Sequence, residues 1–386
     1  MRPEERQADC AHEAHAGASS AYTADVKLLT TLLTSLLVGC TAGSLGSDGG
    51  WHPPSAERSR TFQRQLEAAR AEQELPGLAM AIAFRDSREL WVSSTGFSNL
   101  ETQTEWKPTD ESRIGSVTKT FTAALIFQLV EEGKLTLDDP LEKWVPRWYR
   151  GVTLRHLLGH TSGIASYNYI GSFDSSRSWT PEGLVQWAFD LEPALRFTPG
   201  TQWEYSNTNF ILLGLVIEAA TGHSYGEELS TRLLLPLGLT DTRLALTGDQ
   251  SPRLVRSYSS TPPVENSLSN DPSMGWAAGG IVSTPHDLAL WTLALYGGQV
   301  ISAESLRAMT TPGGLTPPEQ SPYGLGAFTE SDGELSISGH TGGIAGYSTY
   351  AYALKNPSVS LVVMSNWQAT NLRAASQFGW TSVLKP

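Results

Sequence analysis

The chain has 386 residues, of which 40% are hydrophobic and 12 are tryptophan, so it carries enough apolar material for one or two large buried cores. Its formal net charge is −12 and it contains no run of lysine or arginine, which argues against nucleic-acid binding. Cys10 and Cys40 are its only cysteines, and both precede the body of the chain, which excludes a disulfide framework or a cysteine-based metal site there.

The amino-terminal segment has the pattern of an export signal. Residues 26–40 read VKLLTTLLTSLLVGC, an apolar run that is too short to span a bilayer comfortably and has the length of a secretory signal core. Its last four residues resemble the lipobox of bacterial lipoproteins, in which the cysteine is acylated. A simple cleaved signal or a buried apolar helix is the alternative. We therefore expect residues 1–40 to be a leader, Cys40 to be the lipidation site, and residues 41–57 to be a flexible tether.

Residues 1–25 do not fit such a signal, because they contain five acidic residues and two arginines, whereas the start of a secretory signal is basic. We hypothesise that they are not translated and that synthesis starts at Val26 from an alternative start codon. The expected location is outside the cytoplasm. There the chain would be lipid-anchored in the bacterial cell envelope and face the periplasm.

Residues 58–386 are expected to form one catalytic domain. A helix with one apolar side is predicted at 58–71, and two apolar runs at 78–84 and 89–94 predict a β-hairpin. Residues 118–130 are apolar nearly all round, which is typical of a buried helix.

The rest of the chain turns from helices to strands. Further helices are predicted at 154–158, 181–191, 210–220, 233–239 and 287–296. Strands are predicted at 333–339, 347–354 and 358–365, before a last helix at 371–383. This order favours an α+β fold, with one antiparallel sheet built from both chain ends and flanked by helices. A mostly helical subdomain would be inserted at about 116–270, with the functional site at the seam.

The first candidate motif, Ser116-Val117-Thr118-Lys119, lies at the start of the predicted buried helix. A spacing of three residues places the serine hydroxyl and the lysine amine on one helix face. The partial positive charge of a helix N-terminus favours a developing alkoxide, and a desolvated lysine can be neutral and act as a base. Ser-x-x-Lys alone is a weak signal, but in this position it predicts a serine nucleophile.

The second motif, Tyr205-Ser206-Asn207, precedes the helix predicted at 210–220. A phenolate beside Lys119 can take the serine proton and return it to a leaving group, so tyrosine and lysine are both candidate bases. Asn207 can orient the lysine and donate to a substrate carbonyl. An ordinary helix start would show the same local pattern.

The third motif, His340-Thr341-Gly342, follows the strand predicted at 333–339. An edge strand can hold an extended substrate by main-chain bonds, and its N–H with that of Ser116 can form an oxyanion hole. His340 is expected to face the leaving group or a substrate carboxylate, and Gly342 permits close approach. A satisfied structural histidine is the alternative.

No cofactor or metal is predicted. His156 and His160 are four residues apart, as in some zinc sites, but no third ligand is near them in the sequence. The chain also lacks a glycine-rich dinucleotide or phosphate loop.

Together these segments resemble the serine β-lactamase and penicillin-recognising enzyme family, closest to its class C-like branch. The resemblance covers about residues 60–385 and is carried by the segments 115–141, 157–164, 199–214, 277–289, 323–326 and 338–347. It implies a β-lactamase/transpeptidase-like fold with Ser116 as nucleophile and Lys119 and Tyr205 as the acid/base pair. It also implies a substrate side made of Asn207, His340, Thr341 and Gly342.

Two departures bear on the substrate. The third motif begins with histidine, where class C β-lactamases have Lys-Thr-Gly, which argues against efficient β-lactam hydrolysis. In the carboxypeptidases of this family, a basic residue after Tyr-Gly-Leu-Gly binds the terminal carboxylate of the substrate, whereas residues 327–330 here read Ala-Phe-Thr-Glu.

The predicted function is hydrolysis of an amide or ester through an acyl-serine enzyme, foremost as a D-alanyl-D-alanine carboxypeptidase or D-peptidase. A carboxylesterase, a weak class C β-lactamase, and a non-catalytic lipid-anchored binding protein on the same fold are the alternatives. The expected partners are a small-molecule or peptide acyl substrate and the membrane, through the lipid on Cys40. The sequence gives no oligomeric state.

Overall fold

The computed structural model describes residues 50–169, 172–191, 193–249, 251–259, 263–267, 270–332, 335–354, 356 and 358–384. The predicted leader, with Val26 and Cys40, lies outside these residues, as does most of the predicted tether. Within the described ranges no helix has the length and apolarity needed to cross a membrane.

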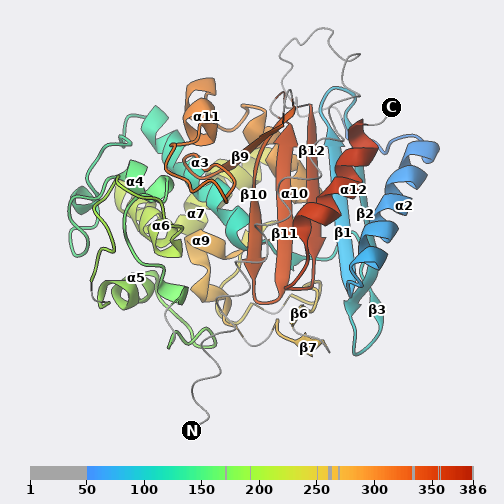
Figure 1. Ribbon diagram of the computed structural model, residues 1–386, viewed down its shortest axis with the longest axis horizontal. Helices are drawn as coiled ribbons and strands as arrows, with labels where there is room; N and C mark the ends of the chain where they lie inside the picture. Colours follow the sequence, from blue (N-terminus) through green and yellow to red (C-terminus); the bar gives the residue numbers. More distant parts are fainter. Residues whose placement is uncertain are drawn as a thin grey trace.

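An antiparallel sheet built from both ends of the chain organises the fold (Figure 1). In the described chain it has seven strands in the order β3-β2-β1-β12-β11-β10-β9. Their bounds are β1 Gly77–Phe84, β2 Glu89–Asn99, β3 Thr104–Glu105, β9 Phe328–Asp332, β10 Leu335–Ile344, β11 Tyr347–Leu354 and β12 Val359–Ser365. The predicted hairpin is β1–β2, and β1 pairs on its other side with β12, so the predicted sheet is confirmed.

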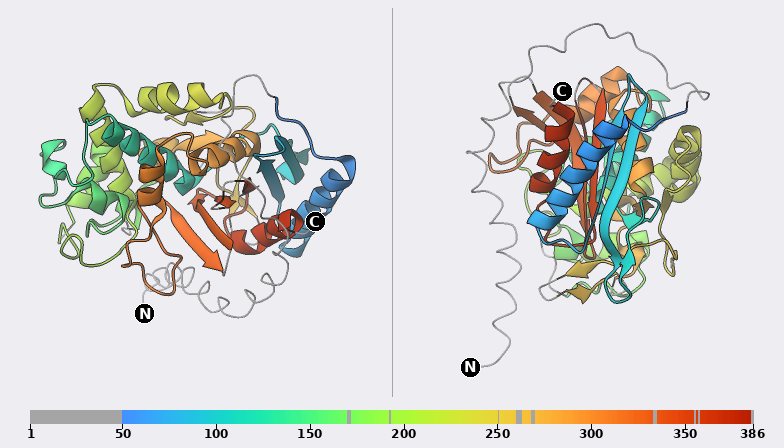
Figure 2. Two further views of the ribbon diagram at one scale, coloured as in Figure 1. Left: turned by 90° about the horizontal axis from the view of Figure 1, so that it is seen from above. Right: turned by 90° about the vertical axis from the view of Figure 1, so that its right-hand side faces the viewer.

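The two faces of the sheet are covered by different helices. The helices α2 (Ala56–Glu72) and α12 (Leu372–Leu384) pack side by side on one face (Figure 2), while α10 (Pro285–Tyr296) packs on the other. Side chains alternate between the faces along a strand. In β1 the larger residues Leu78, Met80 and Ile82 pack toward α2, and the alanines between them face α10 and α3 (Thr118–Glu131). Small side chains on that second face allow helices to approach the sheet closely.

The helical region lies beside the sheet (Figure 1, left). Its remaining helices are α4 Leu154–Leu158, α5 Pro181–Phe189, α6 Asn207–Thr221, α7 Tyr225–Leu229, α8 Leu235–Leu237, α9 Trp276–Gly279 and α11 Ala303–Thr310. Short strand pairs are formed by β4 Ser112–Arg113, β5 Arg243–Leu244, β6 Tyr258–Ser259, β7 Val264–Glu265 and β8 Ile281–Ser283. The α+β class is confirmed by this arrangement of helices and antiparallel sheet.

Several predicted elements have different bounds in the structure, such as the strand predicted at 89–94, which continues to Asn99 as β2. The helix predicted at 233–239 is a π-helical turn, Ser230–Leu234, followed by the short α8, which stops at Gly238 with φ +67°. Pro236 has no N–H, so it fits only the first turn of a helix. The strand predicted at 333–339 continues to Ile344 as β10, so the third motif lies inside a strand and not after it.

Candidate active site

Ser116 lies in a 3₁₀ turn, Gly115–Val117, that leads directly into α3. The turn is held against the sheet by close backbone contact with β10. Gly115 has φ +51°, and an ideal Cβ there would lie 2.8 Å from the Gly343 nitrogen, so this position requires glycine. The serine therefore stands at the N-terminus of a buried helix, next to the edge of a strand.

Lys119 is buried one helical turn away, with its amine directed at Ser116. Its Nζ lies 3.0 Å from Ser116 Oγ, 2.6 Å from Asn207 Oδ1 and 2.7 Å from the Ala278 carbonyl oxygen. Burial holds the pKa of Lys119 well below 10.5. A neutral amine has two N–H groups and one lone pair. The two N–H groups can donate to Asn207 Oδ1 and the Ala278 carbonyl oxygen, and the lone pair can accept from the Ser116 hydroxyl.

Tyr205 lies beside the nucleophile. Burial raises the pKa of Tyr205, and the polar side chain of Ser116 lowers it more weakly. Lys119 Nζ lies 4.9 Å from the centre of the tyrosine ring. The structure thus brings together the two predicted acid/base residues and the predicted nucleophile, with surroundings that favour the uncharged form of both lysine and tyrosine.

Asn207 is the first residue of α6 and is fixed by a polar chain. Its side-chain Oδ1 accepts from Lys119, its Nδ2 donates to Asn168 Oδ1 at 2.9 Å, and its backbone N–H donates to Ser166 Oγ at 2.8 Å. Ser166 Oγ in turn donates to Asn168 Oδ1. One hydrogen of the Asn207 amide is left for a substrate carbonyl.

The third motif is arranged differently from its prediction. His340 is only 1% exposed, its Nε2 lies 3.2 Å from the Tyr323 hydroxyl, and its Nδ1 contacts the Thr341 carbonyl. Burial lowers the pKa of His340 to about 3, so the ring is neutral. Thr341 is partly exposed, and Gly342 is packed against Ile114 and Ser116. The histidine therefore lies beneath the strand surface and is not a free cation.

The edge of β10 is open where the motif lies. Strand β9 pairs only with residues 335–339, whereas β11 pairs with 337–344, so residues 340–344 have a partner on one side among the described strands. Gly343 is exposed and its nitrogen lies beside Gly115. Free main-chain N–H groups at this edge and at Ser116 can face a carbonyl oxygen.

The sequence also contains Gly222-His223-Ser224-Tyr225-Gly226, which has the spacing of a nucleophile elbow. The structure places this serine between α6 and α7, with no strand before it. Its Oγ accepts from the Glu227 N–H and donates to the Glu227 carboxylate, which is a helix capping box. This serine is therefore a structural cap and lies outside the candidate site.

The two histidines weighed as metal ligands are used structurally. Nδ1 of His156 accepts from the Thr153 N–H, and Nδ1 of His160 accepts from the Ser206 N–H. In the described part of the chain, no group of three or more possible metal ligands occurs.

Sequence reasoning missed Asn168, Ala278, Tyr323 and the role of His160 beside Tyr205. Asn168 and Tyr323 reach the site from loops distant in the sequence. Ala278 contributes its backbone carbonyl, a group that every residue has, so the residue type gives no sign of this role. The resemblance segments 157–164, 277–289 and 323–326 include three of these four residues, which is the signal that could have found them.

Comparisons with known proteins relate this chain to one family. The Beta-lactamase family model matches residues 62–380. Penicillin-binding protein 4* of Bacillus subtilis is 30% identical over 295 residues, which is 72% of this chain and 65% of that protein. A D-stereospecific amidohydrolase from Streptomyces sp. is 33% identical, with a TM-score of 0.73, over 84% of this chain and 98% of that one. The octameric penicillin-binding protein homologue from Pyrococcus abyssi is 27% identical, with a TM-score of 0.73, over 84% and 77%.

The fold and these relatives define a serine hydrolase. The chain belongs to the beta-lactamase family, and the resemblance read from the sequence is confirmed. It spans slightly less than two thirds of the length of the Bacillus protein.

Proposed function

We propose that the protein forms an acyl-enzyme on Ser116 and hydrolyses an amide or ester of a D-amino acid, releasing an uncharged leaving group. The observation that carries the mechanism is the 3.0 Å approach of Lys119 Nζ to Ser116 Oγ, with both amine hydrogens directed at other acceptors. Neutral Lys119 takes the Ser116 proton as Oγ attacks the carbonyl carbon. The N–H groups of Ser116 and Gly343 stabilise the oxyanion.

Breakdown of the tetrahedral intermediate needs a proton on the leaving group. Tyr205 gives its hydroxyl proton to the departing nitrogen or oxygen, and the Lys119 ammonium restores it. Water then attacks the acyl ester, with the same pair moving protons in reverse order, and Ser116 is regenerated. Asn207 and the edge of β10, at Thr341 and Gly342, hold the acyl part of the substrate.

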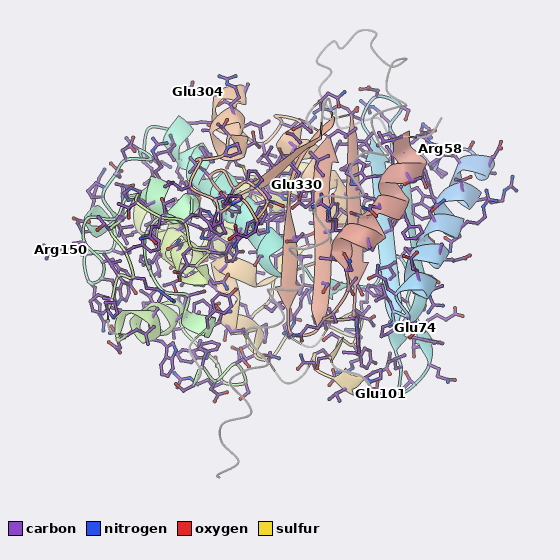
Figure 3. The ribbon with its side chains drawn as sticks, in the orientation of Figure 1. Arg58, Glu74, Glu101, Arg150, Glu304 and Glu330 are labelled. Carbon is purple, nitrogen blue, oxygen red and sulfur yellow. The ribbon has the colours of Figure 1, made fainter. Side chains whose placement is uncertain are left out.

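The preference for an uncharged leaving group is supported by the charges around β10. His340 is neutral and bonded to Tyr323, so it offers no cation to a substrate carboxylate. Glu330 on β9 (Figure 3) is acidic and pairs with Arg373 at 3.2 Å. Arg113, three residues before the nucleophile, directs its guanidinium to the Asn270 carbonyl and the Tyr347 ring. The Streptomyces relative is named a D-stereospecific amidohydrolase, which fits this proposal.

A matched pair of peptides tests this proposal. We expect kcat/KM for an N-acetyl-D-Ala-D-Ala amide to exceed that for the free acid by at least about tenfold, because neutral His340 offers no cation to the free carboxylate. A factor of ten corresponds to about 1.4 kcal/mol. Intact mass should show an acyl adduct on the wild type and none on Ser116→Ala. Faster turnover of the free acid would favour the carboxypeptidase reading, and fastest turnover of nitrocefin or p-nitrophenyl butyrate would favour the β-lactamase or the esterase. No adduct with any substrate would favour the binding protein.

For the leader we propose export and lipid anchoring through Cys40, supported by the sequence of residues 26–40 alone. Cells fed radiolabelled palmitate should incorporate the label into the full chain and lose it in Cys40→Ser. An unlabelled wild-type protein would contradict the anchor.

A further inference from the structure

His160 contacts the chain on both sides of Tyr205. It follows α4, and its carbonyl oxygen accepts from the Glu204 N–H at 2.9 Å. Its ring Nδ1 accepts from the Ser206 N–H at 3.1 Å. The N–H groups of the residues directly before and after the tyrosine are therefore both bound to one residue.

The backbone of His160 is itself unusual. Its φ is +57°, a left-handed conformation that residues other than glycine uncommonly adopt, although histidine is enriched there together with asparagine and aspartate. The side chain is fully buried, at 0% exposure, and its ring centre lies 4.2 Å from that of Tyr205. A strained backbone conformation costs free energy, and it persists only where many surrounding contacts hold the residue in that conformation.

The chemistry of the ring points to positioning and not to proton transfer. Because Nδ1 accepts the backbone N–H, the proton of the neutral ring is on Nε2. Nε2 has no hydrogen-bond partner among the described residues and lies among the rings of Trp203, Tyr205 and Tyr323. Burial keeps the pKa of His160 well below 6.5, so the acceptor persists at neutral pH.

We propose that His160 is the positioning residue for Tyr205: it binds the N–H groups of the residues on either side of the tyrosine and so sets the distance of its hydroxyl from Ser116. The inference rests on the proposed function, in which Tyr205 moves a proton. A displacement of about 1 Å in a catalytic group can lower the rate by about 100-fold.

Two isosteric variants isolate the acceptor. In His160→Asn the side-chain oxygen takes the place of Nδ1, and asparagine tolerates positive φ, so the Ser206 N–H keeps its partner. In His160→Gln the oxygen takes the place of Nε2, and this partner is lost. We expect the rate of Ser116 labelling, measured as formation of the acyl adduct with the N-acetyl-D-Ala-D-Ala amide, whose departing nitrogen takes its proton from Tyr205, to stay within about fivefold of wild type in the first variant and to fall about 100-fold in the second.

A double-mutant cycle separates positioning from general stability. In a Tyr205→Phe background, His160→Gln should slow labelling by less than about threefold, because the group that it positions is absent. His156→Ala, which also removes a ring acceptor of a backbone N–H, is the matched control. It should lower the melting temperature and leave the labelling rate within about threefold of wild type.

The inference would be overturned if His160→Gln slowed Ser116 labelling equally in the wild-type and Tyr205→Phe backgrounds. It would also be overturned if His160→Asn lowered the labelling rate more than about tenfold while its melting temperature stayed at the wild-type value. If His160→Gln does not fold, His160→Ala takes its place in the cycle. The labelling rate of His160→Asn then still tests the inference by itself. Failure of the proposed function looks different, because Tyr205→Phe alone would then leave the labelling rate unchanged or Ser116→Ala would still be labelled.

Discussion

Lys119→Met is expected to lower kcat/KM for the preferred substrate by at least about 1,000-fold, because it removes the group that takes the proton of Ser116. Methionine fills a similar volume and has no proton to accept or donate. The hydrogen-bonding groups of Asn207 and Ala278 that face Nζ at 2.6 and 2.7 Å would lose a donor. Steady-state kinetics beside Lys134→Met, the same change at an exposed lysine, provides the control.

The pH dependence of the same variant gives an independent check. The free amine is the active form, so wild-type kcat/KM should rise as the pH rises through the pKa of Lys119, which burial holds well below 10.5. This rising limb should be absent from the residual activity of Lys119→Met. An unchanged limb in the variant would assign the titration to another group.

Lys119→Met should change stability in the opposite sense to activity. Above the folded pKa of Lys119 the buried amine is neutral, while the unfolded chain still binds a proton until about pH 10.5. Raising the pH toward that value therefore stabilises the wild type. Lys119→Met, with no charge to bury, should be the more stable protein at neutral pH, and the difference in unfolding free energy should narrow as the pH rises.

Gly342→Ala is expected to separate β10 from the nucleophile. An ideal Cβ at Gly342 would lie 1.9 Å from the Ile114 carbonyl oxygen and 3.1 Å from the Ser116 nitrogen, so the strand or the turn must shift. We expect kcat/KM to fall by about 100-fold or more and the unfolding free energy to fall by about 1–3 kcal/mol. Kinetics and urea denaturation measure the two effects.

The adjacent glycine supplies the control for this steric argument. At Gly343 a Cβ would have its nearest neighbour, the Tyr347 carbonyl oxygen, at 4.0 Å. Gly343→Ala should therefore keep its unfolding free energy within about 0.5 kcal/mol of the wild type. If Gly342→Ala kept both wild-type kinetics and wild-type stability, close contact between β10 and the turn would not be needed.

Local sequence patterns predicted most of the elements that carry the site. The i, i+3 spacing of Ser116 and Lys119 on a buried helix is enough to bring their side chains together, and the structure has them 3.0 Å apart. Alternating and apolar runs predicted β1, β11 and β12 because each is buried along its whole length. These patterns depend on neighbours in the sequence.

Predictions failed where a long-range contact decides the conformation. The strand predicted at 333–339 continues through the third motif to Ile344 as β10, and glycine is needed at Gly342 because the backbone of residues 114–116 lies against the strand. Burial of His340 in β10 lowers its pKa and makes the ring neutral. The position of this histidine in the motif had suggested instead that it faces the leaving group or a substrate carboxylate. The helix α11 was missed although Ser302 caps it and Glu304 lies in its first turn, a signal that the sequence does show.

The pairing of β1 with β12 has a consequence for biosynthesis. Leu78 lies opposite Ser365, so the centre of the sheet joins two segments that leave the ribosome at widely separated times. The strand that faces Ser116 is likewise made more than two hundred residues after it. Contacts so distant in sequence slow folding, and loop closure must precede them. The nascent chain therefore stays without a completed sheet, and without a complete candidate site, until β12 has been synthesised.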